Sequence, residues 1–314
     1  MARAGDQAEG GLTGPELEAG FTAVGLAPGQ VVLVHSAMRT LGRIDGGAST
    51  VAQALIDVVG PRGTIVVPTF TFVHEAEAEP IIDPAADRSE MGAITEAVRR
   101  RPDARRSTAF RHSFAAVGRR AEVIAGVDPR LAPFDLRSAF GVMLALDTQV
   151  LLIGVTYSNS TSHHFAEWMS DVPYRHTIVR RVRVRRPNGR VVAMRLADFQ
   201  PRPSPDGSYY GSRATDFNRL GRMLEDRGLV TVTTLGNAVL RRFAMRDLLA
   251  LAQAEAARDF NVFRTPDGKK TEITSLADGV IAISDETVDA AGRPERHIWS
   301  VVDPTAIYRR DRSG

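Results

Sequence analysis

The stretch from residue 31 to residue 67 constrains the fold of this chain more than any other. Residues 31–34 and 64–67 are short runs of β-branched and other apolar side chains, the pattern of buried strands. Between them, a helix is expected after Gly46-Gly47, with one apolar face formed by Val51, Leu55, Val58 and Val59, and Gly60-Pro61 ends it. A strand, crossover helix and strand in this order favour a parallel pair and an α/β fold.

A third apolar run, Val150 to Val155, suits another buried strand and leads into Thr161-Ser162-His163-His164-Phe165-Ala166-Glu167. Thr161 or Ser160 is placed to cap a helix, which would put His164 and Glu167 three residues apart on one face. A carboxylate one turn away can fix the tautomer of a histidine and favour its protonated form, so the pair is a candidate catalytic dyad. Two surface residues with an ordinary helical pairing would have the same spacing, so spacing alone leaves both interpretations open.

In α/β sheets, ligands gather beyond the carboxyl ends of the strands. His35-Ser36 and the segment from Thr69 to Phe72 lie at such ends, as does the segment around His164. The loop from Thr69 to Glu90 is long and acidic, with Glu75, Glu77, Glu79, Asp83, Asp87 and Glu90. It is either a solvated surface loop or the lining of a pocket, and a pocket of this charge would take a cationic acceptor.

The remaining elements follow from caps, periodicity and turn residues. Thr13 to Glu16 has the form of a capping box that opens a short helix. Asn188-Gly189 is the turn of a hairpin whose first strand alternates valine and arginine and whose second begins at Val191-Val192. The other expected elements are helices over 91–101, 137–146, 216–227 and 240–257, strands over 110–118 and 229–233, and a small β extension after residue 261. We expect one compact unit rather than two domains.

The overall composition excludes several classes of protein. The 314 residues carry a net charge of +3, and the 40 basic residues are spread along the chain, which gives no reason to expect nucleic acid. Without cysteine there is no disulfide framework, thiolate zinc site or cysteine nucleophile. No apolar run approaches ~18 residues and no signal peptide is visible, so we expect a soluble, cytoplasmic protein without membrane contact.

Several short motifs, taken in order, resemble those of the aminoglycoside 3-N-acetyltransferase family. They are His35-Ser36-Ala37-Met38-Arg39-Thr40-Leu41-Gly42 with Gly46-Gly47, Gly63 to Thr71, Met91-Gly92 with Glu96, Arg106-Ser107 through His112 to Gly118, Leu152 to Val155, Thr161 to Glu167, and Pro173-Tyr174-Arg175. The resemblance runs from about residue 13 to residue 258. It departs from the family pattern at Ala37, where the family has serine, and at Ala109-Phe110, where it has His-Pro.

The resemblance implies a three-layer α/β/α fold with a mixed sheet, and transfer of an acetyl group from acetyl-coenzyme A (acetyl-CoA) to an amine. His164 would be the general base and Glu167 its orienting partner, while Thr161 is our candidate for stabilising the charge that develops on the carbonyl oxygen. Motif matches assign the coenzyme to His35, Ser36, Arg39, Thr40, Gly42, Ser107, His112 and Phe114. For the acceptor we expect Thr71, Phe72, Glu75 and Asp83.

On this basis we expect a flexible N-terminus over 1–12, an acetyltransferase domain over 13–258, and a β-rich extension over 259–314 packed on the same unit. The acceptor is a small-molecule amine, no metal is required, and a homodimer is possible. One alternative is a catalytically silent homologue that keeps the scaffold and binds a ligand, suggested by Ala37 and Ala109. Another is a metal hydrolase that uses His163, His164, His112 or Glu167, although adjacent histidines on a helix point about 100° apart.

Overall fold

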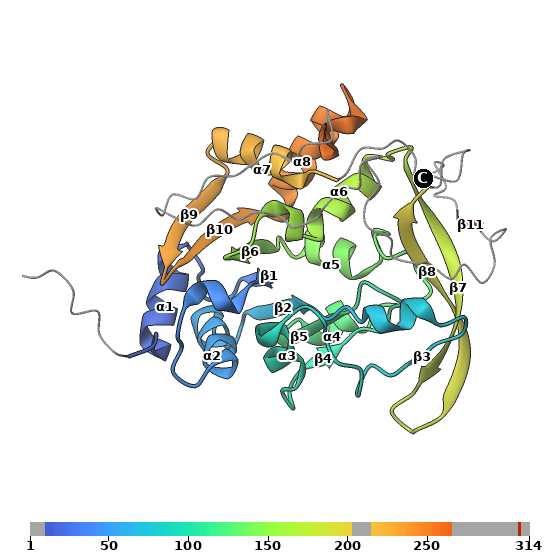
Figure 1. Ribbon diagram of the computed structural model, residues 1–314, viewed down its shortest axis with the longest axis horizontal. Helices are drawn as coiled ribbons and strands as arrows, with labels where there is room; N and C mark the ends of the chain where they lie inside the picture. Colours follow the sequence, from blue (N-terminus) through green and yellow to red (C-terminus); the bar gives the residue numbers. More distant parts are fainter. Residues whose placement is uncertain (1–9, 203–214, 266–306, 309–314) are drawn as a thin grey trace, which may run out of the picture.

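The computed structural model describes residues 10–202, 215–265 and 307–308, and its main feature is a seven-stranded mixed sheet (Figure 1). In spatial order its strands are β4 (Arg105–Arg106), β5 (Phe114–Gly118), β2 (Thr64–Pro68), β1 (Val31–Ser36), β6 (Gln149–Ile153), β10 (Ala238–Ala244) and β9 (Val230–Leu235). β1 pairs in parallel with both β2 and β6, and the outer pairs are antiparallel. The predicted parallel pair is therefore confirmed.

Helices cover both faces of this sheet because alternate residues of each strand are apolar on both sides. In β1, Val32 and Val34 join one core cluster, while Val31 and Leu33 join the other. The first cluster packs under α1 (Gly14–Ala23), α2 (Ala48–Val59) and α3 (Ala93–Arg99); the second packs under α4 (Ala121–Ala125), α5 (Ala139–Ala145), α6 (Ser162–Met169), α7 (Phe217–Asp226) and α8 (Met245–Ala256). The fold is thus α/β/α in three layers, as expected.

A long hairpin, β7 (Arg175–Arg185) and β8 (Val191–Pro201), extends along one side of the domain (Figure 1). The Asn188-Gly189 turn is where the sequence predicts it, and Gly189 has a φ of 79°, which the turn requires. β3 (Ile81–Ile82) and β11 (Ile307–Tyr308) pair with the other edge of β7. Short 3₁₀ helices connect these elements: η1 (Met38–Leu41), η2 (Phe72–Ala76), η3 (Tyr157–Asn159) and η4 (Phe260–Phe263).

The long helix expected over residues 240–257 is wrong in its first part. Residues 238–244 form β10, which lies between β6 and β9, and only then does α8 begin at Met245. The run from Leu240 to Ala244 fits either periodicity, and the open edge of β6 decides for a strand because pairing there satisfies its backbone groups. The short helix α4 was not predicted.

The two ends of the chain are described only in part. Leu12 forms a bridge to Ile44, and residues 1–9 lie outside the described part of the structure. Val262 and Phe263 of η4 are buried in the same core as α6 and α8, so the start of the expected extension packs on the main unit. The rest of the extension lies outside the described residues except for β11, so its β-rich character stays a prediction, as do the domain bounds.

Within residues 10–202, 215–265 and 307–308, none of the helices combines the length and the apolar composition needed to cross a bilayer.

Candidate active site

The predicted site lies at the carboxyl ends of the central parallel strands. β1, β2 and β6 are parallel, so their carboxyl ends lie on the same side of the sheet, and β5 starts on that side because it runs antiparallel to β2. Ser113 ties two of these ends together: its hydroxyl donates to the Thr69 carbonyl oxygen at 2.9 Å. The ends of these strands therefore bring together His35, the segment after Thr69, His112 and the chain leading into α6.

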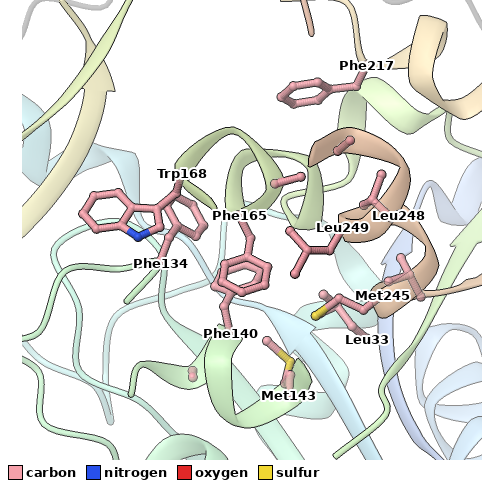
Figure 2. Close-up of a cluster of buried hydrophobic side chains, with 14 of the residues drawn as sticks. Leu33, Phe134, Phe140, Met143, Phe165, Trp168, Phe217, Met245, Leu248 and Leu249 are labelled. Atoms are coloured by element: carbon pink, nitrogen blue, oxygen red, sulfur yellow. The ribbon is translucent and has the colours of Figure 1, made fainter. Parts of the chain in front are cut away.

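Helix α6 is fixed by its apolar side chains. Phe165 is fully buried and stacks on Phe140 of α5 with ring centroids 5.5 Å apart. Figure 2 shows Phe165 beside Phe140 and Leu249 in the middle of the cluster. Because a buried aromatic side chain contributes several kcal/mol, about 3–5 on truncation to alanine, this packing sets the rotation of α6. That rotation directs His164 and Glu167 to the strand ends.

His164 and Glu167 form the predicted pair. Nδ1 of His164 lies 2.6 Å from Oε2 of Glu167, and the glutamate side chain is fully buried while 27% of the histidine side chain is exposed. An ionised carboxylate can only accept a hydrogen bond, so Nδ1 carries the proton and Nε2 keeps its lone pair. The second ring nitrogen of His164 is therefore the one that can take a proton from a substrate.

Two residues that the sequence did not single out hold Glu167. The Tyr174 hydroxyl donates to Oε1 at 3.0 Å, and Nε of Arg175 lies 2.8 Å from Oε2 in an ion pair. Both are part of the Pro173-Tyr174-Arg175 motif, which follows α6 closely in the sequence. That closeness could have predicted that they lie beside the dyad. Their contacts mean that the buried carboxylate has a partner for each oxygen.

Burial and the neighbouring charges together favour the neutral form of His164. Burial lowers the pKa of His164, and the positive charges of Arg175 and Arg111 act in the same direction, against Glu167. Burial alone would raise the pKa of Glu167. The charges of Arg175 and His164, with the hydrogen bonds from His164 and Tyr174, hold that pKa below its ordinary value. The sequence predicted that Glu167 would favour protonation of His164; that influence is present and is outweighed.

The neighbouring histidine has a different environment. His163 is fully buried, stacks on Phe217 at 5.0 Å between centroids, and has no hydrogen-bond partner on either ring nitrogen within the described part of the chain. Burial lowers its pKa to about 3. His163 is therefore a core residue rather than a second member of the dyad.

The predicted side-chain cap of α6 is wrong. Thr161 is the N-cap residue, but its φ of −65° and ψ of −19° are helical, and its side chain makes no capping hydrogen bond. A capping side chain usually reaches the amides of the first turn from an extended backbone. Ser160 instead contacts the Ser162 hydroxyl at 2.6 Å. Thr161 is buried at the start of the helix, and its role as an oxyanion donor stays a prediction.

The residues assigned to the coenzyme divide into two groups, and the first lies after β1. His35 is buried at the end of the strand, and burial lowers its pKa to about 3. Ser36 is half-buried beside it, Arg39 and Thr40 lie in η1, and Gly42 follows with a φ of 83°. Thr40 fits closely over Gly154, where a Cβ atom would lie 1.7 Å from the threonine hydroxyl. This group lies at the carboxyl end of β1, as predicted.

The second group surrounds the start of β5. The Ser107 hydroxyl accepts a hydrogen bond from the Phe114 amide at 2.9 Å, and the Phe114 ring is buried against Phe140. His112 lies between Phe70 and Phe134, with centroids 5.1 and 4.9 Å away, and burial lowers its pKa well below the ordinary value. The structure gives Ser107 and Phe114 roles in packing and strand pairing, and a coenzyme contact remains a prediction for both.

Several carboxylates of the acidic loop form contacts within the protein. Glu75 is buried and lies 2.8 Å from the Arg111 guanidinium, and burial raises its pKa to about 7. Asp83 accepts from two amides of its own turn and pairs with Arg185 at 3.0 Å. Thr71 donates to the Arg88 carbonyl oxygen, and Phe72 packs at the edge of the core. Glu75 and Asp83 therefore form ion pairs within the fold, and their contacts with an acceptor stay predictions.

Within the described ranges, no group of three or more histidine and carboxylate side chains is arranged to hold a metal ion. The metal-hydrolase alternative gains no support there.

The fold and the site at the strand ends define an α/β/α enzyme scaffold with a buried carboxylate–imidazole pair. Comparison with known proteins identifies which scaffold it is: the family model described as aminoglycoside 3-N-acetyltransferase matches residues 33–256. The chain belongs to this family. An acetyl-CoA-dependent N-acetyltransferase, as the motifs predicted, is thereby confirmed as its enzyme class.

Individual relatives agree. The chain is 30% identical over 246 residues to aminoglycoside N(3)-acetyltransferase IV of Salmonella sp, covering 77% of this chain and 87% of the relative. It is 30% identical over 287 residues to aminoglycoside N(3)-acetyltransferase VII of Streptomyces paromomycinus, covering 83% and 97%. The crystal structure of apo aminoglycoside acetyltransferase AAC(3)-IVa superposes with a TM-score of 0.65 at 28% identity, covering 83% of this chain and 94% of that one.

Proposed function

We propose that this chain transfers the acetyl group of acetyl-CoA to an amine of an aminoglycoside, or of a related amino sugar or natural-product amine, with His164 as general base. The observation that carries the proposal is the 2.6 Å contact between Nδ1 of His164 and the buried Glu167 carboxylate, which leaves Nε2 free. Supporting it, the AAC(3)-IVa relative has been crystallised as a histidine-to-alanine variant with a gentamicin and with apramycin.

The amine, which is mostly protonated at neutral pH, first gives its ammonium proton to solvent, because only the free lone pair attacks. The neutral nitrogen then forms a bond to the thioester carbonyl carbon and becomes positively charged, and a base is required to remove one of its two remaining protons, which moves to Nε2 of His164. The carbon–sulfur bond then breaks, and the departing thiolate takes that proton to give free coenzyme A. Glu167 stays ionised throughout and stabilises the imidazolium that forms in between.

Both substrates must meet at the exposed face of His164. The donor would reach it from the ends of β1 and β5, where His35, Ser36 and His112 lie, and Thr161 at the start of α6 is our candidate donor to the carbonyl oxygen. The acceptor would approach from the acidic loop, beside Phe72 and Glu75. A homodimer and a cytoplasmic location belong to the same proposal as predictions.

Thiol release tests the function directly. The protein is mixed with acetyl-CoA and a panel of aminoglycosides, amino sugars and amino nucleosides, and free thiol is followed over time. We expect at least one amine to raise the rate well above the background hydrolysis. Calorimetry on the same panel distinguishes the silent-homologue alternative, which predicts binding of an amine without any release of thiol and would refute the proposal.

A further inference from the structure

Away from the dyad, a groove lies between the β7–β8 hairpin and the loop that follows α4. Its volume is about 1020 Å³, a size suited to a nucleotide or a similar small molecule. Its lining, taken over the described residues, includes none of those proposed above for catalysis, donor or acceptor. The groove is thus separate from the strand-end site.

Its walls are rich in arginine. The arginines that line it are Arg130, Arg181, Arg183, Arg186 and Arg195, against the carboxylates Glu79 and Asp128. Asp128 is already paired with Arg130 at 2.7 Å. The β7–β8 hairpin supplies four of these arginines and the loop after α4 supplies the fifth, so positive side chains surround one space.

The hairpin register makes this charge costly. Arg181 lies directly opposite Arg195 on the neighbouring strand, and Arg183 is two residues further along the same face. Like charges at directly opposed positions destabilise a β ladder. Arg181 and Arg183 make no ion pair and no side-chain hydrogen bond with any other residue in the described part of the chain. An anion in the groove would relieve the repulsion.

The remaining lining specifies what kind of anion fits. Val127, Pro129 and Val179 add apolar side chains to the lining beside the arginines. A flat organic group can pack on such apolar side chains, and guanidinium groups match phosphate oxygens with two parallel hydrogen bonds. From these observations we propose that the groove binds an organic phosphate of nucleotide size, with its phosphates on Arg181 and Arg183.

The test is equilibrium binding with adenosine triphosphate as the probe and inorganic triphosphate as a second probe without the organic part. Calorimetry on the full chain should show saturable binding of adenosine triphosphate, and weaker binding of inorganic triphosphate. The double variant Arg181→Gln/Arg183→Gln should bind about tenfold more weakly or worse, since contacts to charged groups typically contribute this much. Arg119→Gln/Arg120→Gln, which removes the same charge from exposed positions elsewhere, should bind as the unchanged protein does.

Thermal melting supplies a readout that guards against misfolding. Without ligand, the groove variant should melt at or above the temperature of the unchanged protein, because the like-charge repulsion is removed. With adenosine triphosphate, only proteins with an intact groove should gain stability. Equal losses in both double variants would overturn the proposal, and so would displacement of the probe by coenzyme A, which would make the groove part of the donor site. Failure of the acetyl-transfer assay would leave these binding results unaffected.

Discussion

The strand ends around α6 and the groove beside the β7–β8 hairpin differ in how their charged side chains are paired. At α6, Glu167 is fully buried and is contacted by His164, Tyr174 and Arg175. On the hairpin, Arg181 and Arg183 are exposed and make no ion pair with another described residue. The carboxylate at α6 is compensated before any substrate arrives, whereas Arg181 and Arg183 have no counterion among the described residues.

The difference shows what each region can do. Compensated, buried charges hold an imidazole in one orientation and one protonation state, which is what catalysis of a proton transfer needs. Uncompensated, exposed charges favour binding of an ion but do not orient a reacting group, and salt screens them. The following changes are chosen to break or sharpen this contrast.

Removing the proposed base should have the largest effect. His164→Ala should lower kcat by about 10²–10⁴-fold, the usual contribution of a positioned general base, without unfolding the protein because 27% of the side chain is exposed. Steady-state thiol release measures the loss. His176→Ala, a change at another partly exposed histidine, is the matched control and should stay near full activity. Similar rates for both variants would remove His164 from the mechanism.

Removing Arg175 should shift the pH dependence of the rate. Burial lowers the pKa of His164 most, the charges of Arg175 and Arg111 lower it further, and Glu167 raises it. In Arg175→Met the pKa of His164 should rise. As the pH falls, His164 then becomes protonated earlier, so the acid limb of the kcat/KM profile shifts to higher pH. Well below the pKa of His164, each unit by which that pKa rises should lower the neutral fraction, and with it kcat/KM, about tenfold, whereas kcat/KM well above it should change little. Arg175→Lys should restore part of the shift, whereas a loss of activity with an unmoved acid limb would indicate a purely structural role.

His163 should affect stability rather than catalysis. Its pKa is about 3 in the fold and about 6.5 in the unfolded chain. A lowered pKa means that this histidine's contribution to stability is complete above pH 6.5 and is lost as the pH falls toward 3. At pH 5 the loss should be about 2 kcal/mol, and His163→Phe should avoid it because phenylalanine does not titrate. Urea unfolding at pH 7.5 and pH 5 measures both values, and an equal loss in the two proteins would contradict the burial of the imidazole.

The sequence predicted the central fold because its signals were local. The runs at 31–34, 64–67 and 150–153 are buried strands, and the Asn188-Gly189 turn forms the hairpin. The prediction failed at Leu240–Ala244, where the open edge of β6 selects a strand. No local pattern could have shown that edge.

The dyad was predicted from spacing and a family resemblance, but its setting was not. Glu167 is compensated by Tyr174 and Arg175, which approach it only because β7 begins beside α6. Likewise, Glu75 was expected to face a substrate, while its pairing with Arg111 depends on two loops that meet in the fold. Opposed arginines on the hairpin follow from register, which a sequence specifies through its turn and its apolar face together.

The most direct measurement is nitrogen-15 nuclear magnetic resonance of His164 in the free protein over a range of pH. We predict a neutral ring with its proton on Nδ1 at pH 7.5, a pKa below the ordinary histidine value, and loss of that single tautomer in Glu167→Gln. An imidazole that is protonated at pH 7.5, or that carries its proton on Nε2, would contradict the account.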